Sequence, residues 1–345
     1  MFYRAARSFL FSLEPECAHT LAFGVLESAR RLGASRLLAG RRVPGLPVRA
    51  MGLDFPNPVG LAAGLDKNGD HIDALLDLGF GFIEVGAVTP RAQPGNAKPR
   101  LFRLPDANAL INRMGFNNLG VDHLVDNFRR RAPRGIVGVN IGKNFDTPIE
   151  RAAEDYLHCL RKVYPHASFI TANVSSPNTR GLRALQVGEA IDALLAALAL
   201  ERTALEQQYG RRVPLAVKIA PDLEDADIDA VAERVLAHGI DAVIATNTTL
   251  SRKGVEHLGT SRESGGLSGA PLRARATEVV AKLAPRLAGR AVVIGVGGIS
   301  SAADALEMLD AGATLVQVYT AFIYQGPGLI PELVRGLAKP DRTRR

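Results

Sequence analysis

Residues 168–183 read SFITANVSSPNTRGLR, an apolar run that changes abruptly into a cluster of small polar side chains. The β-branched start of this stretch, Phe169–Ala172, predicts a buried strand. Two carboxamides and three hydroxyls follow within seven residues: Asn173, Ser175, Ser176, Asn178 and Thr179. Such groups can hold a planar hydrogen-bonding ligand and present a hydroxyl to it. Pro177 also favours an ordinary polar turn, so the stretch alone leaves both interpretations open.

Short apolar runs of this kind recur along the chain after residue 55, and amphipathic segments separate them. The predicted strands are Val59–Ala63, Phe82–Gly86, Ile136–Ile141, Phe169–Val174, Leu215–Ala220, Ala242–Thr246, Val292–Val296 and Leu315–Tyr319. The predicted helices include Asp70–Leu78, Ile149–Val163, Ile191–Gln208, Asp225–His238, Leu272–Leu287 and Ala302–Leu309. Eight strands that alternate with helices are typical of a (β/α)8 barrel. An open doubly wound sheet is the rival, but it usually carries G-x-G-x-x-G after its first strand, where this chain has AAGLDK at 62–67.

Polar residues follow or end five of the predicted strands. They are GLDKN at 64–68, NIGKN at 140–144, the cluster after residue 172, Lys218, and TNTT at 246–249. The carboxyl ends of barrel strands meet at one mouth, and active sites collect there. A single lysine or asparagine at such a place is often only a solvated loop residue. Five strand ends in succession predict a functional site.

The last two strands carry the features of a phosphate site. GVGGIS follows the seventh strand at 295–300, a helix begins near Ala302, and Tyr319 and Thr320 follow the eighth strand. Glycines let backbone N–H groups approach a phosphate, and a helix N-terminus favours its charge. Lys218 lies among apolar neighbours and is costly to bury without an anionic partner, although its stem could also reach the surface. A reduced flavin is negatively charged near one ring edge, so the barrel is predicted to bind a flavin mononucleotide.

Composition limits the remaining classes. The net charge is +7, and residues 1–50 hold eight arginines against three glutamates, so 8 − 3 = +5 lies there and only about +2 in the rest. That balance argues against a nucleic-acid-binding body. Cys17 and Cys159 do not suggest a disulfide framework, and the seven histidines lack metal-ligand spacing, so no metal site is expected. No run of 18 apolar residues and no cleaved signal peptide is apparent.

In combination, five motifs resemble dihydroorotate dehydrogenase of the quinone-reducing, membrane-associated class 2, from about Tyr3 to Gly328. They are LAAGLDKNGD at 61–70, VTPRAQPGNAKPRLFRL at 88–104, INRMGFNN at 111–118, NVSSPNTRGLR at 173–183 and GVGGI at 295–299. The resemblance implies an FMN-dependent barrel that oxidises dihydroorotate to orotate in pyrimidine synthesis. It implies a membrane quinone as the final electron acceptor.

The resemblance also implies site residues. Ser176 is the expected catalytic base, in the place where class 1 enzymes have cysteine. The expected FMN contacts are Ala63, Gly64, Leu65, Asp66, Lys67, Ala87, Asn140, Asn173, Lys218, Thr246, Gly269, Gly298, Tyr319 and Thr320. The expected substrate contacts are Lys67, Asn112, Arg113, Met114, Gly115, Phe116, Asn173, Asn178, Asn247 and Thr248. A serine hydroxyl is a weak base without a nearby histidine, so a relay through Thr179 or water is expected to assist it.

Residues 1–40 precede the catalytic barrel, which we place at 41–345, and predict two amphipathic helices. The second begins near Pro15 and has an apolar stripe of Ala18, Leu21, Ala22, Val25, Leu26, Ala29 and Leu32. One interpretation is a helical hairpin that caps the barrel. The other is a basic arm that lies in an anionic membrane surface and gives quinone access to the flavin, with His19 and Arg100 beside that path.

Together these features predict a monomeric peripheral protein on the cytoplasmic face of a bacterial inner membrane. Two other functions stay open: a lyase or isomerase acting on a sugar phosphate, and a non-catalytic flavin-binding barrel. The lyase or isomerase shares the phosphate site but does not need INRMGFNN, Lys218 or the basic arm.

Overall fold

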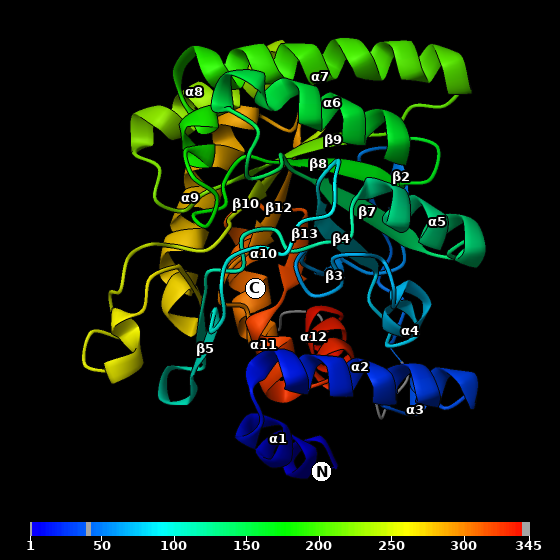
Figure 1. Ribbon diagram of the computed structural model, residues 1–345, viewed down its shortest axis with the longest axis vertical. Coiled ribbons are helices and arrows are strands. Elements are labelled where there is room, and N and C mark those ends of the chain that lie inside the picture. The colour runs from blue at the N-terminus through cyan, green and yellow to red at the C-terminus, as the bar shows by residue number, and fades with distance from the viewer. Residues whose placement is uncertain (1, 39–42, 340–345) are drawn as a thin grey trace.

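The computed structural model describes residues 2–38 and 43–339 and has a closed barrel of eight parallel strands at its centre (Figure 1). The barrel strands are β3 (Val59–Leu61), β4 (Phe82–Val88), β7 (Ile136–Ile141), β8 (Phe169–Asn173), β9 (Leu215–Ile219), β10 (Ala242–Ala245), β12 (Val292–Val296) and β13 (Leu315–Val318). They pair in chain order, and β13 pairs with β3 to close the barrel. Every predicted strand is present, which confirms the (β/α)8 prediction.

An antiparallel hairpin, β1 (Val48–Ala50) and β2 (Leu53–Phe55), supplies Phe55 to the apolar cluster inside the barrel. Phe55 packs edge-on against Phe82, with 5.2 Å between ring centroids, and Phe82 lies 6.1 Å from Phe169. Space for these rings requires glycine on the neighbouring strand, because a Cβ at Gly60 would lie 2.3 Å from the ring of Phe82. The rings fill part of the barrel interior with apolar atoms.

Helices surround the barrel and bury its outer face. They are α4 (Ile72–Leu76), α5 (Val121–Arg131), α6 (Ala152–Val163), α7 (Gly188–Tyr209), α8 (Asp225–Ala237), α9 (Arg273–Leu287), α10 (Ala302–Asp310), α11 (Thr320–Gln325) and α12 (Leu329–Leu337). The six predicted helices agree with α4 and α6 to α10 to within a few residues at their ends. The sequence did not predict α5, α11 or α12.

A small antiparallel sheet, separate from the barrel, was also not predicted. It consists of β5 (Leu101–Leu104), β6 (Ala109–Asn112) and β11 (Gly266–Gly269). The pairing of β6 with β11 joins Asn112 to Gly266, which are far apart in the sequence. This sheet has its own apolar cluster, which includes Leu104, Ile111 and Leu267.

The amino-terminal helices α1 (Phe2–Ser12), α2 (Pro15–Arg31) and α3 (Ser35–Leu38) lie together at one end of the molecule (Figure 1). The apolar stripe predicted on α2 divides in two. Ala18 and Leu26 are buried, and Phe23 is buried with them, whereas Leu21, Val25 and Leu32 are 42%, 57% and 83% exposed. The predicted boundary at residues 40 and 41 lies outside the described residues, and so does the side chain of Arg4.

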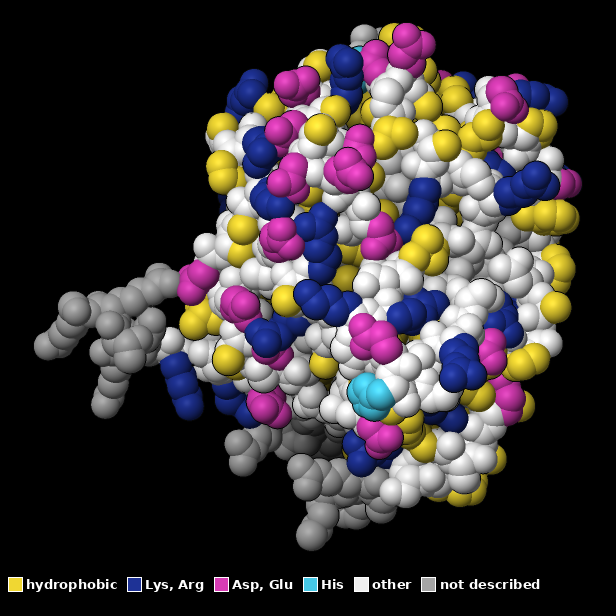
Figure 2. All heavy atoms as spheres, turned by 90° about the vertical axis from the view of Figure 1, so that its left-hand side faces the viewer, with side chains coloured by type: hydrophobic (Ala, Val, Ile, Leu, Met, Phe, Trp, Pro, Cys, Tyr) yellow, Lys and Arg dark blue, Asp and Glu magenta, His cyan; other side chains and the backbone are white. Residues whose placement is uncertain are grey.

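The surface carries charges of both signs. Figure 2 shows basic and acidic side chains mixed over one face of the molecule, with small hydrophobic areas between them. Within residues 2–38 and 43–339, no helix is both long enough and apolar enough to cross a bilayer. The same residues contain no group of three or more histidine, cysteine or acidic side chains placed to hold a metal ion.

Candidate active site

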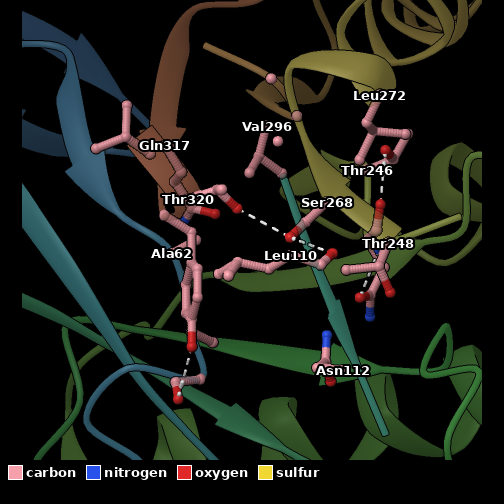
Figure 3. A pocket seen from close by; sticks show the side chains of 18 of the residues that line it. Ala62, Leu110, Asn112, Thr246, Thr248, Ser268, Leu272, Val296, Gln317 and Thr320 are labelled. Atoms are coloured by element: carbon pink, nitrogen blue, oxygen red, sulfur yellow. Dashed lines mark hydrogen bonds between the residues drawn. The ribbon is translucent and has the colours of Figure 1, made fainter. Parts of the chain in front are cut away.

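A cavity of about 270 Å³ lies at the carboxyl ends of the barrel strands (Figure 3). Nineteen of the residues expected to bind cofactor or substrate, or to act as the base, line it: Ala63, Gly64, Lys67, Ala87, Asn112, Met114, Gly115, Phe116, Asn173, Ser176, Asn178, Lys218, Thr246, Asn247, Thr248, Gly269, Gly298, Tyr319 and Thr320. They come from seven strand ends, the small sheet and the segment that follows it. The fold therefore brings together residues up to 257 positions apart (63 to 320) in one site.

Four expected residues do not line this cavity. The carboxylate of Asp66 accepts hydrogen bonds from the backbone N–H of Asp70 (2.9 Å) and His71 (2.8 Å). Arg113 pairs with Glu263 at 2.6 Å. The side chains of Leu65 and Asn140 are buried beside the cavity wall. The binding roles of these four residues stay predictions. The contacts of Asp66 hold the backbone at residues 70 and 71, and those of Arg113 hold Glu263.

Several lining residues were not predicted from the sequence. Leu110 and Ser268 come from the small sheet, and the Ser268 hydroxyl accepts a hydrogen bond from Thr320 Oγ1 at 2.9 Å (Figure 3). Gln317 lies inside β13 and is fully buried. The sequence feature that could have identified Gln317 is a single polar residue within an apolar strand, LVQV at 315–318. The same feature identified Lys218 within LAVKI at 215–219.

The asparagines of the site form two hydrogen-bonded groups. Asn173 donates to Asn140 Oδ1 at 3.0 Å, and its own Oδ1 accepts from the Ser175 hydroxyl at 3.2 Å. Asn247 donates to Ser175 Oγ at 3.0 Å. In the second group, Asn178 donates to Asn112 Oδ1 at 3.0 Å. Because each carboxamide is held by a neighbour, the set is preorganised to read a flat polar ring.

Ser176 lines the same cavity as these amides and is 6% exposed. Its hydroxyl oxygen accepts a hydrogen bond from the backbone N–H of Asn178 at 3.3 Å. Among the described residues, no imidazole or carboxylate hydrogen-bonds to it. The hydroxyl of Thr179 is buried without a partner among these residues, and Thr179 does not line the cavity. Its part in the relay stays a prediction.

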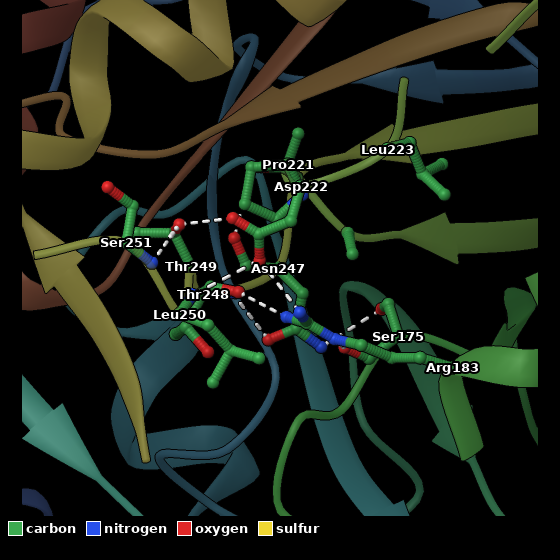
Figure 4. A network of polar contacts seen from close by, with 12 residues as sticks. Ser175, Arg183, Pro221, Asp222, Leu223, Asn247, Thr248, Thr249, Leu250 and Ser251 are labelled. Carbon is green, nitrogen blue, oxygen red and sulfur yellow. Dashed lines mark hydrogen bonds and ion pairs between the residues drawn. The ribbon is translucent and has the colours of Figure 1, made fainter. Parts of the chain in front are cut away.

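Arg183, in the motif that contains Ser176, clamps the loops after β8 and β10 together (Figure 4). Its guanidinium donates to the carbonyl oxygens of Ser175 (3.1 Å) and Thr248 (2.8 Å) and to the carboxylate of Asp222 (2.7 Å). Asp222 in turn accepts from the Thr249 hydroxyl. This clamp fixes the position of Ser176 relative to Asn247 and Thr248.

Lys67 and Lys218 are the only charged side chains among the described residues that line the cavity. Burial lowers the pKa of Lys67 to about 8, with a smaller lowering by Arg100 and opposing contributions from Glu16 and Asp66. Burial also lowers the pKa of Lys218, and Glu84 opposes that shift. A cavity with two cations and no lining carboxylate is suited to anionic ligands.

The residues present fit a flavin nucleotide. Gln317 Oε1 and Thr248 Oγ1 are buried acceptors without a partner in the described chain, and both residues line the cavity. Gly269 and Gly298 have φ of +96° and +71°, and a Cβ at Gly298 would lie 2.5 Å from Arg273 Cβ. These glycines keep the backbone open where a phosphate is expected, next to the loop that precedes α10.

The amino-terminal helices contact the same cavity. Arg100 donates to both carboxylate oxygens of Glu16, at 2.7 and 2.9 Å, and Arg103 donates to the carbonyl oxygens of Leu10, Phe11 and Leu13. Phe11 packs edge-on against Tyr324, a cavity-lining residue of α11, at 5.2 Å between centroids. His19 Nε2 lies 2.7 Å from the carbonyl oxygen of Leu65.

The chain is similar to known proteins over nearly its whole length. A family model described as dihydroorotate dehydrogenase matches residues 45–340. The chain is 59% identical to a "Dihydroorotate dehydrogenase (quinone)" of Azotobacter vinelandii, over 97% of this chain and 96% of that relative. It is 57% identical to a protein of the same name from Pseudomonas syringae, over 99% of this chain and the whole of that relative.

Solved structures give the same result. The "DHODH" of Eimeria tenella in complex with ferulenol superposes with a TM-score of 0.84 at 36% identity, over 94% of this chain and 90% of that chain. The ligand-free form of the Eimeria tenella protein superposes with a TM-score of 0.81 at 37% identity, over 92% and 93%.

Proposed function

Because the chain belongs to the dihydroorotate dehydrogenase family and to its quinone-dependent class, we propose that its cavity binds FMN and that Ser176 takes the substrate proton. The reaction of this class oxidises dihydroorotate to orotate in pyrimidine synthesis and passes the electrons to a quinone. One observation carries the residue assignment. Ser176, the two lysines and four asparagines all line a single cavity; the asparagines are Asn112, Asn173, Asn178 and Asn247.

FMN would occupy the part of the cavity formed by β8, β9, β10, β12 and β13. The phosphate would bind near Gly269, Gly298 and Thr320, and the ring would lie near Asn173, Lys218 and Thr246. When bound, FMN supplies the acceptor for the substrate hydride. Lys218 would place its charge beside the ring edge that becomes negative on reduction.

Dihydroorotate would bind between the two groups of amides. Lys67 would pair with its carboxylate, while Asn112, Asn178 and Asn247 would hold its ring amides. Ser176 would then take the proton from C5. A water, or the Thr179 hydroxyl, which has no partner among the described residues, would pass it on. The clamp made by Arg183 would keep the serine in position.

The pKa of Lys67 predicts how ligand affinity depends on pH. Because burial lowers this pKa to about 8, the free protein loses the cation above that pH and must take up a proton to bind a carboxylate. The Kd of orotate should therefore be constant below about pH 7 and rise about tenfold per pH unit above about pH 8. Titration of the visible flavin spectrum with orotate measures it.

Two variants at this position act as controls for that result. Lys67→Arg keeps its charge, so its orotate affinity should not fall across the same pH range. Lys67→Gln should bind orotate weakly at every pH. A wild-type Kd that stays constant to more than one unit above pH 8 would exclude Lys67 as the carboxylate partner.

The arm of residues 1–40 would attach the protein to an anionic membrane surface and admit quinone toward the flavin. Two observations support this role: Leu21, Val25 and Leu32 are exposed, and Phe11 of the arm packs on Tyr324, which lines the cavity. We place the protein on the cytoplasmic face of the inner membrane as a peripheral monomer, with residues 41–345 as the catalytic domain.

The nature of the cofactor is tested by extraction. The purified protein should be yellow, and heat should release a flavin whose mass is that of FMN. Release of riboflavin would contradict the phosphate site at Gly298, and release of FAD would contradict FMN as the cofactor. A colourless protein would favour the lyase or isomerase acting on a sugar phosphate.

A further inference from the structure

Glu84 is a carboxylate buried inside the barrel, and none of the proposed ligand contacts involves it. It lies on β4 and is 1% exposed. One of its oxygens accepts a hydrogen bond from Asn140 Nδ2, and the other accepts from Gln317 Nε2, both at 2.7 Å. Neither Glu84 nor Asn140 lines the cavity, whereas Gln317 does. A buried charge is costly, so its retention here calls for a specific purpose.

The chemistry of a carboxylate fixes the direction of every bond that leaves it. An ionised carboxylate only accepts hydrogen bonds, so Asn140 and Gln317 must both turn their NH₂ groups toward Glu84. The Oδ1 atom of Asn140 then faces Asn173, which donates to it at 3.0 Å. As a result, Asn173 directs its own Oδ1 toward Ser175 and Asn247.

Gln317 is the second amide that donates to Glu84, and it lies at the cavity itself. Because Gln317 donates to Glu84, its Oε1 points away from the carboxylate, and this oxygen is buried without a partner in the described chain. Gln317 lies at the wall of the cavity (Figure 3). An acceptor held in this way is suited to an N–H donor of a bound ring, and both flavin and dihydroorotate carry ring N–H groups.

We propose that Glu84 is a positioning residue that sets the direction of the two amides bound to it. As a result, Asn173 turns its oxygen toward Ser175 and Asn247, and Gln317 presents its oxygen to the ligands. This inference rests on the proposed function, because it concerns how the FMN and dihydroorotate sites are oriented. Glu84 acts through Asn140 and Gln317 and touches neither ligand. Its charge also opposes the effect of burial on the pKa of Lys218.

The replacement Glu84→Gln tests the inference because it changes hydrogen-bonding direction with almost no change in shape. The new side chain has one oxygen and one NH₂, so it can accept from only one of its two partners. The other amide must turn over. If Gln317 turns, it presents NH₂ where the ligand needs an acceptor; if Asn140 turns, Asn173 must turn with it, and Asn247 loses its acceptor. We expect about a 10- to 100-fold loss in affinity for FMN, for orotate or for both.

Asp241→Asn is a matched control that makes the same chemical change immediately before β10. Asp241 accepts from Arg202 at 2.8 Å and from the Leu215 N–H at 2.9 Å, and it does not line the cavity. The Asp241→Asn variant should have a lower melting temperature than the wild type and the same Kd for orotate. This control separates a loss of stability from a loss of amide orientation.

The double variant Glu84→Gln/Asn140→Asp gives the decisive comparison. The new amide at position 84 can accept from Gln317 and donate to the new carboxylate at position 140. That carboxylate still accepts from Asn173, so Asn173 and Gln317 both recover their direction. The double variant should recover at least about tenfold of the lost affinity. If the single variant fails to fold, the double variant should still fold and bind FMN and orotate.

Flavin content per chain and the Kd of orotate are measured for all forms. Single-variant values equal to wild type would overturn the inference, and so would a double variant as weak as the single one. The wild type is measured first as a separate check. If it holds no FMN and binds no orotate, the proposed function fails rather than the role of Glu84.

Discussion

Replacement of Ser176 by alanine should slow flavin reduction by dihydroorotate about 10²- to 10⁴-fold while FMN stays bound. The hydroxyl is the only group of residue 176 that can take a proton, and alanine keeps the loop geometry. Asn173, Lys218 and Gln317 all keep their positions, so the flavin site should be unchanged. Anaerobic stopped-flow mixing with dihydroorotate, followed by the visible flavin absorbance, measures the rate.

Two further variants make this result specific. Ser268→Ala removes another hydroxyl that lines the same cavity but is held by Thr320, and it should slow reduction by less than about tenfold. Ser176→Cys restores a group that can take a proton and should be faster than Ser176→Ala. If Ser176→Ala reduces its flavin within about tenfold of the wild-type rate, Ser176 is not the base.

The second large effect is expected on the amino-terminal arm. Changing Leu21 and Val25 together to glutamate should abolish binding to vesicles of anionic lipid and lower ubiquinone turnover at least tenfold. Each apolar side chain contributes about 1.5–3 kcal/mol when it enters an apolar phase, so losing two weakens membrane affinity at least about 100-fold. Flavin reduction by dihydroorotate should be unaffected, because neither residue lines the cavity.

The substitution is a sharper test than removal of residues 1–40, which should also abolish quinone turnover. Removal would expose the partners of Phe23 and leave Arg100 without Glu16, so it also threatens stability. Leu200→Glu, on the exposed face of α7, is the matched control and should change neither property. Normal vesicle binding and quinone turnover in the double variant would contradict the role of the arm.

The barrel could be predicted from the sequence because its strands are short apolar runs bounded by polar strand ends. Each run has a local signal, and the order of strands in a barrel follows the order in the chain. The small sheet had no such signal. Its strands are four residues long, and β6 pairs with β11 across more than 150 residues, so no local periodicity reveals it.

The site was predicted through its motifs, and the structure adds the connections between them. Lys218 was predicted to be a site residue because it is a cation in an apolar strand. A reduced flavin was the anion expected beside it. Glu84 is a second anion, and its position next to Asn140 and Gln317 depends on the closure of the barrel. Arg183 belonged to a quoted motif, but its contact with the loop after β10 could be seen only in the folded chain.

The apolar stripe of α2 shows a further limit. Helical periodicity identified Ala18, Leu21, Val25 and Leu26 as one stripe, since it reports only which residues share a broad face. The fold separates them into a buried edge and an exposed edge. The exposed edge is the part that is available to a membrane.

Anaerobic addition of dihydroorotate to the purified protein tests the central claim most directly. The account predicts a yellow protein whose visible absorbance is bleached stoichiometrically by dihydroorotate and restored by ubiquinone. A flavin that dihydroorotate leaves oxidised, or a protein without flavin, would contradict it.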